Sequence, residues 1–116
     1  MKFIFLAAGK SKRIFNKIKK NKCLIKIKKK PLIKLLIDEV YKTKIKDVSI
    51  VTGFRSGFIK RELKEYNNIK FIYNKKYNTT EMLYSLILGV KSANTDIVIS
   101  YSDILFDYKM INHLIE

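Results

Sequence analysis

Near the start of the chain stands the stretch Phe3-Ile4-Phe5-Leu6-Ala7-Ala8-Gly9, which decides the fold class. An apolar run that mixes aromatic and β-branched residues is typical of a buried strand. The small residues at its end let the backbone turn tightly and approach a ligand closely. Three cations follow within Lys10-Ser11-Lys12-Arg13. A strand, a small-residue turn and a cationic rim predict a phosphate site, although such a turn is equally often a plain strand-to-helix connection.

Strand-like and helix-like patterns alternate along the rest of the chain. Apolar runs predict strands over 2–6, 48–51, 69–73 and 97–99. Apolar residues at helical spacing predict helices over 31–43, 58–66, 83–90 and 108–116, with a loop over 10–21 and a short extended piece over 23–27. This alternation is typical of βαβ units, so we expect an α/β fold with a mostly parallel sheet covered on both faces.

The carboxyl ends of the predicted strands are where a parallel sheet binds ligands. They fall at the Gly9 turn, Thr52-Gly53, Asn74 and Ser102-Asp103. The Gly9 turn and Asp103 are therefore expected to face one crevice. A carboxylate at a strand end is well placed to hold Mg²⁺, but an aspartate in a turn or helix cap occupies the same position.

The net charge of +15 raises the question of a nucleic-acid partner. Nearly all the cations are lysines spread through the chain, and the arginines are Arg13, Arg55 and Arg61. Sequence-specific base readers and bidentate phosphate clamps favour arginine. We therefore interpret the charge as a solvated, lysine-rich surface and expect no specific nucleic-acid partner, although a non-specific polyanion-binding protein stays an alternative.

Length and composition fit one folded domain over residues 1–116, with 47% hydrophobic residues. No apolar run reaches membrane-spanning length. The single cysteine, Cys23, cannot form an internal disulfide, which favours a reducing, cytoplasmic location. A buried cysteine is more often a small core residue than a nucleophile.

Two groups of polar residues allow both a structural and a functional interpretation. Lys22 lies in a lysine-rich run, where solvated surface is the usual role. A polar cluster between the third strand and the third helix would recognise a base or sugar, or would only cap the helix through Thr79 or Thr80. Its members are Asn74, Tyr77, Thr80, Glu81, Met82 and Ser85.

Five short motifs, taken in order, resemble the nucleotidyltransferases that activate sugar phosphates and similar phosphorylated small molecules. They are Leu6-Ala7-Ala8-Gly9-x-x-x-Arg13, Asn21-Lys22-Cys23-Leu24, Lys30-Pro31-Leu32-Ile33, Val51-Thr52-Gly53-Phe54 and Ser102-Asp103. The stretches 77–86 and 100–104 are most similar to the cytidylyltransferase-like branch that acts on phosphocholine, phosphonates and related head groups.

The resemblance implies a Rossmann-like three-layer α/β/α fold and a Mg²⁺-dependent transfer of CMP from CTP to a phosphorylated small-molecule acceptor, with release of pyrophosphate. It implies catalytic roles for Arg13, Lys22 and Asp103, the last also as the metal ligand. The residues that it assigns to the nucleotide are Leu6, Ala7, Ala8, Gly9, Lys10, Ser11, Lys12, Arg13, Lys22, Gly53, Glu81 and Ser85.

The chain departs from the family pattern in three residues and in length. Ser11 stands where a second glycine is usual, Asn21 where a proline is usual, and Glu81 where an asparagine is common. The chain stops in the helix after Asp103, so we expect a domain truncated on its C-terminal side, with an incomplete sheet. A catalytically inactive nucleotide-binding fragment is therefore the first alternative, and apolar surface left by truncation would favour homo-oligomers.

Overall fold

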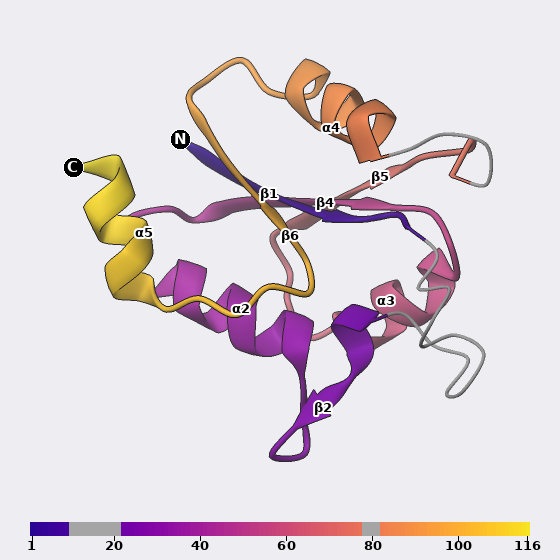
Figure 1. Ribbon diagram of the computed structural model, residues 1–116, viewed down its shortest axis with the longest axis horizontal. Helices are drawn as coiled ribbons and strands as arrows, with labels where there is room; N and C mark the ends of the chain where they lie inside the picture. Colours follow the sequence, from indigo (N-terminus) through magenta and orange to yellow (C-terminus); the bar gives the residue numbers. More distant parts are fainter. Residues whose placement is uncertain (10–21, 78–81) are drawn as a thin grey trace.

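The alternating pattern produces a four-stranded parallel sheet at the centre of the molecule, in the strand order β5-β4-β1-β6. The computed structural model describes residues 1–9, 22–77 and 82–116. The strands are β1 (Lys2–Ala7), β4 (Asp47–Thr52), β5 (Ile69–Tyr73) and β6 (Ile97–Tyr101). Each neighbouring pair is parallel, which confirms the predicted βαβ organisation (Figure 1).

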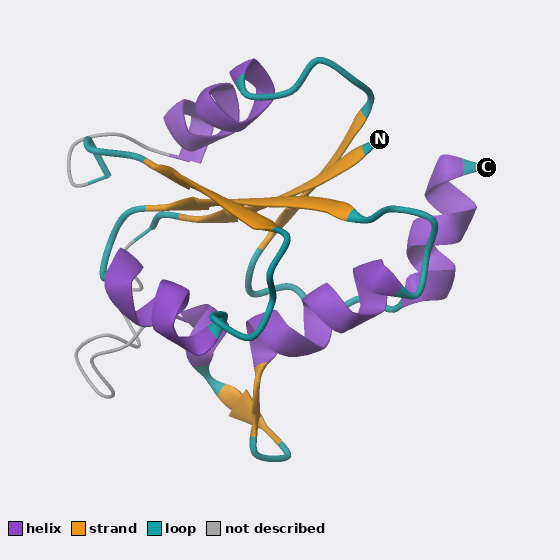
Figure 2. Cartoon of the chain, turned by 180° about the vertical axis from the view of Figure 1, so that it is seen from behind, coloured by secondary structure: helices purple, strands orange, loops and turns teal. Residues whose placement is uncertain are grey.

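Helices cover both faces of this sheet (Figure 2). One face carries α2 (Leu32–Tyr41), α3 (Ser56–Glu62) and α5 (Tyr108–Ile115), and the other carries α4 (Met82–Lys91). The resulting three layers are those of a Rossmann-like α/β/α fold. Within the described ranges, no helix has the length and apolar character needed to cross a membrane.

The central strand β1 is buried along its whole length and supplies side chains to both layers. Because side chains alternate along a strand, Phe3 and Phe5 pack into the core beneath α2, α3 and α5. Ile4 and Leu6 pack into a smaller core on the opposite face, under α4. This two-sided burial explains why the strand is a continuous apolar run rather than an alternating one.

The region before α2 differs from the extended piece expected over 23–27. Residues Lys22–Leu24 form a single 3₁₀ turn, η1, in which the Ile25 N–H donates to the Lys22 carbonyl at 3.1 Å. Cys23 and Leu24 are both buried, whereas consecutive residues of a strand would point to opposite sides. The turn therefore allows both side chains to enter the core.

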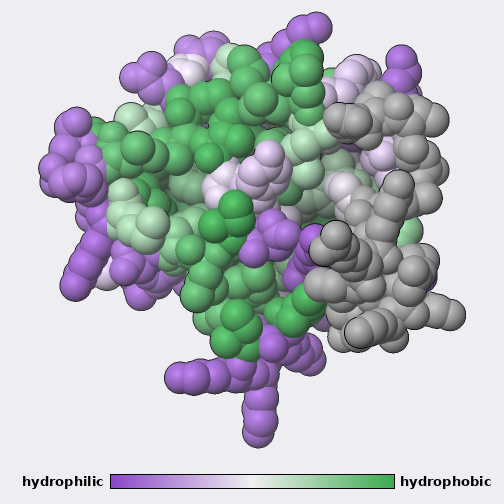
Figure 3. All heavy atoms as spheres, viewed as in Figure 1, coloured by the Kyte–Doolittle hydropathy of each residue, from purple (hydrophilic) through white to green (hydrophobic). Residues whose placement is uncertain are grey.

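A short antiparallel hairpin connects η1 to α2 and projects from the body of the molecule (Figure 1). Its strands are β2 (Lys26–Ile27) and β3 (Lys30–Pro31). Pro31 lies immediately before the first residue of α2 rather than within its first turn, because it also pairs with Lys26. In Figure 3 hydrophilic side chains extend from this hairpin at the bottom of the view.

The remaining differences concern helix ends. The helix expected over 58–66 is α3, which begins at Ser56 and ends at Glu62. It is followed by turns, in which Tyr66 N–H donates to the Leu63 carbonyl at 3.0 Å. The apolar spacing therefore continued past the helix, because Leu63 and Tyr66 still pack on the core from the turns.

Candidate functional site

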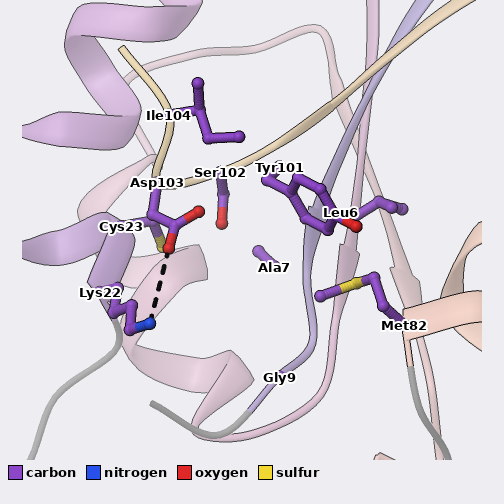
Figure 4. Close-up of a pocket in the computed structure, with 10 residues that line it drawn as sticks. All are labelled: Leu6, Ala7, Gly9, Lys22, Cys23, Met82, Tyr101, Ser102, Asp103 and Ile104. Carbon is purple, nitrogen blue, oxygen red and sulfur yellow. Dashed lines mark ion pairs between the residues drawn. The ribbon is translucent and has the colours of Figure 1, made fainter. Parts of the chain in front are cut away.

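A cavity of about 420 Å³ opens at the carboxyl ends of β1 and β6 (Figure 4). This size falls in the usual range for small-molecule sites. Its lining combines an apolar wall with a few polar groups. The lining residues are Leu6, Ala7, Gly9, Lys22, Cys23, Met82, Tyr101, Ser102, Asp103 and Ile104.

Parallel pairing brings the first and last parts of this site together. Leu6 pairs with Tyr101, and the Ser102 N–H donates to the Leu6 carbonyl at 3.2 Å just beyond the paired strands. Gly9 and Asp103 consequently line the same cavity, as the strand-end argument predicted.

The η1 turn adds a cation to the site. Lys22 Nζ lies 3.8 Å from Asp103 Oδ2, and both side chains are partly exposed at the cavity rim (Figure 4). An ammonium group and a carboxylate held side by side match the two charges of a metal-bound phosphate, since one binds the anion and the other the cation. Neither charge is deeply buried, so both are accessible to a ligand.

Cys23 lies beneath this pair and is 2% exposed. Burial raises the pKa of its thiol to about 12, and the hydrogen bond with the Ser102 side chain offsets this effect only in part. The thiol is therefore neutral at physiological pH, and a neutral buried thiol is a poor nucleophile. The geometry thus agrees with a small core residue rather than with covalent catalysis.

Gly53 supports the Gly9 turn from behind instead of lining the cavity. A Cβ atom on Gly53 would lie 2.5 Å from Tyr77 Cβ and 2.9 Å from the Ala8 carbonyl oxygen. The next residue, Phe54, donates its N–H to that same carbonyl at 3.1 Å. Only glycine allows the backbones to approach this closely, so Gly53 fixes the end of β1.

Ser85 also lies outside the cavity lining. It is 2% exposed, and its Oγ accepts a hydrogen bond from Asn74 Nδ2 at 3.0 Å. The sequence contained a signal for this burial, since Ser85 shares the helical spacing of Met82, Leu86 and Gly89, which all face the sheet. Because Ser85 is polar, it was predicted to contact the nucleotide instead.

Several assigned residues lie outside the described part of the chain. They are Lys10, Ser11, Lys12, Arg13 and Glu81, together with Thr79 and Thr80. Conversely, Tyr101 and Ile104 were not predicted from the sequence as site residues, although both belong to the apolar wall of the cavity. Tyr101 is the last residue of β6, so its place at the carboxyl end of a parallel strand was the signal that could have assigned it to the site.

The carboxylate of Asp103 is the feature of this cavity that suits Mg²⁺. Within residues 1–9, 22–77 and 82–116, no group of three His, Cys, Asp or Glu side chains forms a metal cage. Mg²⁺ is usually held by one or two carboxylates together with substrate phosphates and waters. The single carboxylate of Asp103 at the cavity rim is therefore compatible with a Mg²⁺ ion that also takes ligands from a phosphate or from water.

Comparisons with known proteins agree on the family. The model of the MobA-like NTP transferase domain matches residues 3–116. The chain is 29% identical to a CTP:phosphoglutamine cytidylyltransferase of Campylobacter jejuni, over 99% of the chain and 48% of that protein. It is 30% identical to a choline-phosphate cytidylyltransferase of Streptococcus pneumoniae, over 98% of the chain and 50% of that protein.

A solved structure of a cytidylyltransferase is also similar to this chain. The CTP:phosphocholine cytidylyltransferase of Streptococcus pneumoniae superimposes with a TM-score of 0.76 and 28% sequence identity, over 88% of this chain and 44% of that one. The chain spans about half the length of these two curated relatives.

Proposed function

Because the chain belongs to the family of MobA-like NTP transferase domains, we propose that it takes part in transfer of CMP from CTP to a phosphorylated small-molecule acceptor. The observation that carries this proposal is the convergence of the Gly9 turn, Lys22 and Asp103 on one cavity. The choice of CTP is supported by the cytidylyltransferases among the relatives.

In the proposed reaction, a phosphate oxygen of the acceptor attacks the α-phosphorus of CTP in line. A new P–O bond forms, the bond from the α-phosphorus to the bridging oxygen breaks, and pyrophosphate carries the electron pair away. Most of the catalysis lies in aligning two anions and offsetting the charge that develops on them. No protein nucleophile is required, which is consistent with the neutral thiol of Cys23.

The residues of the cavity have separate tasks in this proposal. The backbone of the Gly9 turn would hold the nucleotide, and Lys22 would contact the α-phosphate region. Arg13, outside the described residues, would bind the β- and γ-phosphates and stabilise the leaving pyrophosphate. Asp103 would hold Mg²⁺, which when bound offsets negative charge on the phosphates.

The ion pair between Lys22 and Asp103 is compatible with these tasks. With a metal-bound triphosphate in the cavity, Lys22 would exchange its carboxylate partner for a phosphate, and Asp103 would exchange an ammonium for a cation. Each group therefore keeps an opposite charge beside it. The ion pair is partly exposed, so little stability would be lost when the ligand takes the place of each partner.

Calorimetric titration with CTP in the presence of Mg²⁺ at moderate salt tests this proposal. We expect binding that is tighter for CTP than for UTP, and weaker after Lys22→Ala than after Lys29→Ala, which removes an exposed lysine of the hairpin. Absence of triphosphate binding by the wild-type chain would sink the proposal. Equal effects of the two substitutions would mean that only bulk charge matters, as in a polyanion-binding protein.

Turnover requires a second measurement, because the chain spans about half of its cytidylyltransferase relatives. Release of pyrophosphate from CTP and phosphocholine, a phosphorylated acceptor, distinguishes an enzyme from an inactive nucleotide-binding fragment. We expect release that depends on Mg²⁺ and is lost after Asp103→Asn. CTP binding without release of pyrophosphate from CTP, whichever phosphorylated acceptor is supplied, would favour the inactive fragment.

A further inference from the structure

Asn74 lies buried at the end of β5 and connects three segments of the chain. Its side-chain Nδ2 donates to Ser85 Oγ on α4 at 3.0 Å, and its Oδ1 accepts from the Lys76 N–H at 2.9 Å. Its own N–H donates to the Thr52 carbonyl at 2.7 Å, and its carbonyl accepts from the Tyr77 N–H at 3.3 Å. One residue therefore fastens the strand end, the turn over 75–77 and α4 to each other.

The first route from Asn74 to the cavity passes through the turn. The hydrogen bonds to Lys76 and Tyr77 fix where Tyr77 lies, and Tyr77 packs directly on the backbone of Gly53. Gly53 in turn lies against the Ala8 carbonyl. A shift of the turn would therefore be transmitted to the end of β1, because the packing leaves no space in between.

The second route passes through α4. The contact with Ser85 holds this helix against the end of β5, and the helix begins at Met82. Met82 lines the cavity and lies beside Gly9, where a Cβ atom would be 3.6 Å from Met82 Cε. Both routes thus end on the Ala8-Gly9 turn, whose backbone would hold the nucleotide in the proposed function.

We propose that Asn74 is a positioning residue that sets the place of the Ala8-Gly9 turn and thereby the affinity for the triphosphate, without touching the nucleotide. This inference rests on the proposed function. Asparagine suits the position because one amide group supplies both the donor for Ser85 and the acceptor for Lys76. An apolar residue would leave the Ser85 hydroxyl and the Lys76 N–H without these partners.

Three variants separate positioning from a general loss of stability. Asn74→Ala removes the side-chain hydrogen bonds to Ser85 and Lys76. Asn74→Asp keeps two acceptors, since the Ser85 hydroxyl can turn and donate. The matched control is Thr43→Val, which removes a buried hydroxyl in the segment before β4. This hydroxyl donates to the Val40 carbonyl at 2.6 Å and accepts from the Ile45 N–H at 3.1 Å.

The affinity for CTP with Mg²⁺ is measured at a temperature below the thermal unfolding of every variant, and circular dichroism verifies that each variant is folded at that temperature. Asn74→Ala is expected to bind about tenfold more weakly, the scale found when an outer partner of a ligand site is removed. Thr43→Val should stay within about twofold of the wild type, with Asn74→Asp between the two. Equal affinities of Asn74→Ala and Thr43→Val would overturn the inference.

A measurement without nucleotide keeps the inference separate from the proposed function. The amide NMR signals of Gly9 and Phe54 should shift in Asn74→Ala and stay unchanged in Thr43→Val. If wild-type protein binds no CTP, the proposed function fails, and these signals still decide whether Asn74 positions the turn. Should Asn74→Ala not fold, Ser85→Ala replaces it with the same expected shifts, and unchanged signals there contradict the inference.

Discussion

Lys22 and Asp103 meet at the rim of the cavity with 3.8 Å between Nζ and Oδ2, although Lys22 precedes α2 and Asp103 follows β6. The contact arises because β1 and β6 are parallel neighbours and because η1 packs beside their carboxyl ends. A partly exposed ion pair of this kind adds little to stability, on the order of 0–1 kcal/mol. We therefore expect Lys22 and Asp103 to contribute to binding of the metal-bound nucleotide rather than to the stability of the fold.

Replacing Asp103 by Asn tests this division between binding and stability. The substitution keeps the size of the side chain and removes its charge, so Mg²⁺-dependent CTP binding should weaken by at least about tenfold. The free energy of unfolding should change by less than about 1 kcal/mol, because the ion pair is partly exposed. Calorimetric titration and urea unfolding measure the two quantities.

The matched control for this experiment is Asp47→Asn. Asp47 Oδ2 lies 4.0 Å from Lys2 Nζ at the opposite end of the sheet, and its side chain is about as exposed as that of Asp103. The control should leave CTP binding unchanged. A similar loss of binding in both variants would contradict a specific role for Asp103.

Gly53→Ala is expected to destabilise the fold. The added Cβ would lie 2.5 Å from Tyr77 Cβ and 2.9 Å from the Ala8 carbonyl oxygen, so the strand end or the turn must move. Overpacking of this kind costs about 1–3 kcal/mol. Urea unfolding should show this loss, and the affinity for CTP should fall with it.

Gly57→Ala provides the opposite case within the same region. Gly57 lies in α3, and a Cβ there would meet nothing within 4 Å. Alanine favours the helix by about 0.5–1 kcal/mol over glycine, so this variant should be slightly more stable than wild type. A destabilisation equal to that of Gly53→Ala would show that close packing is not the cause.

The hairpin before α2 contains backbone strain that can be removed. Lys28 and Lys29 have φ values of 51° and 70°, in the left-handed region that glycine and asparagine tolerate best. The double variant Lys28→Asn/Lys29→Gly should therefore stabilise the chain by about 1–2 kcal/mol. Thermal unfolding tests this, with Lys26→Asn in the adjacent strand as a control that should give no stabilisation.

The thiol of Cys23 should be protected as long as the chain is folded. Burial raises its pKa from 9.0 to about 12, so at pH 8 the folded protein contains roughly a thousandfold less thiolate than the unfolded one. Labelling with a thiol reagent at pH 8 should accordingly be slow in buffer and fast in urea. Equal rates in the two conditions would show that the thiol is not buried.

The same shift predicts how stability depends on pH. The neutral thiol is the form that the fold favours, so its contribution is complete below about pH 9 and is lost as the pH rises from 9 toward 12. Cys23→Ala lacks this titrating group. The difference in unfolding free energy between wild type and Cys23→Ala should therefore shrink over that interval.

The parallel sheet and the general location of the site could both be predicted from the sequence. The apolar runs at Phe3–Leu6 and Ile97–Ile99 predict strands, and helical patterns between the strands favour parallel pairing. Since ligands bind at the carboxyl ends of parallel strands, the Gly9 turn and Asp103 followed as neighbours. These properties are periodic or topological, so they can be read along one chain.

Which polar residues face the cavity, and which partners they meet there, depends on the packing of segments against one another. Ser85 and Lys22 are both polar residues beside apolar ones, yet Ser85 is buried against Asn74 while Lys22 reaches Asp103. Close approach also depends on packing, as at Gly53, where the neighbours Tyr77 and Ala8 come from other segments. Such contacts join residues from different segments, so a local period does not specify the partners, although the helical spacing of Ser85 does indicate that it faces the sheet.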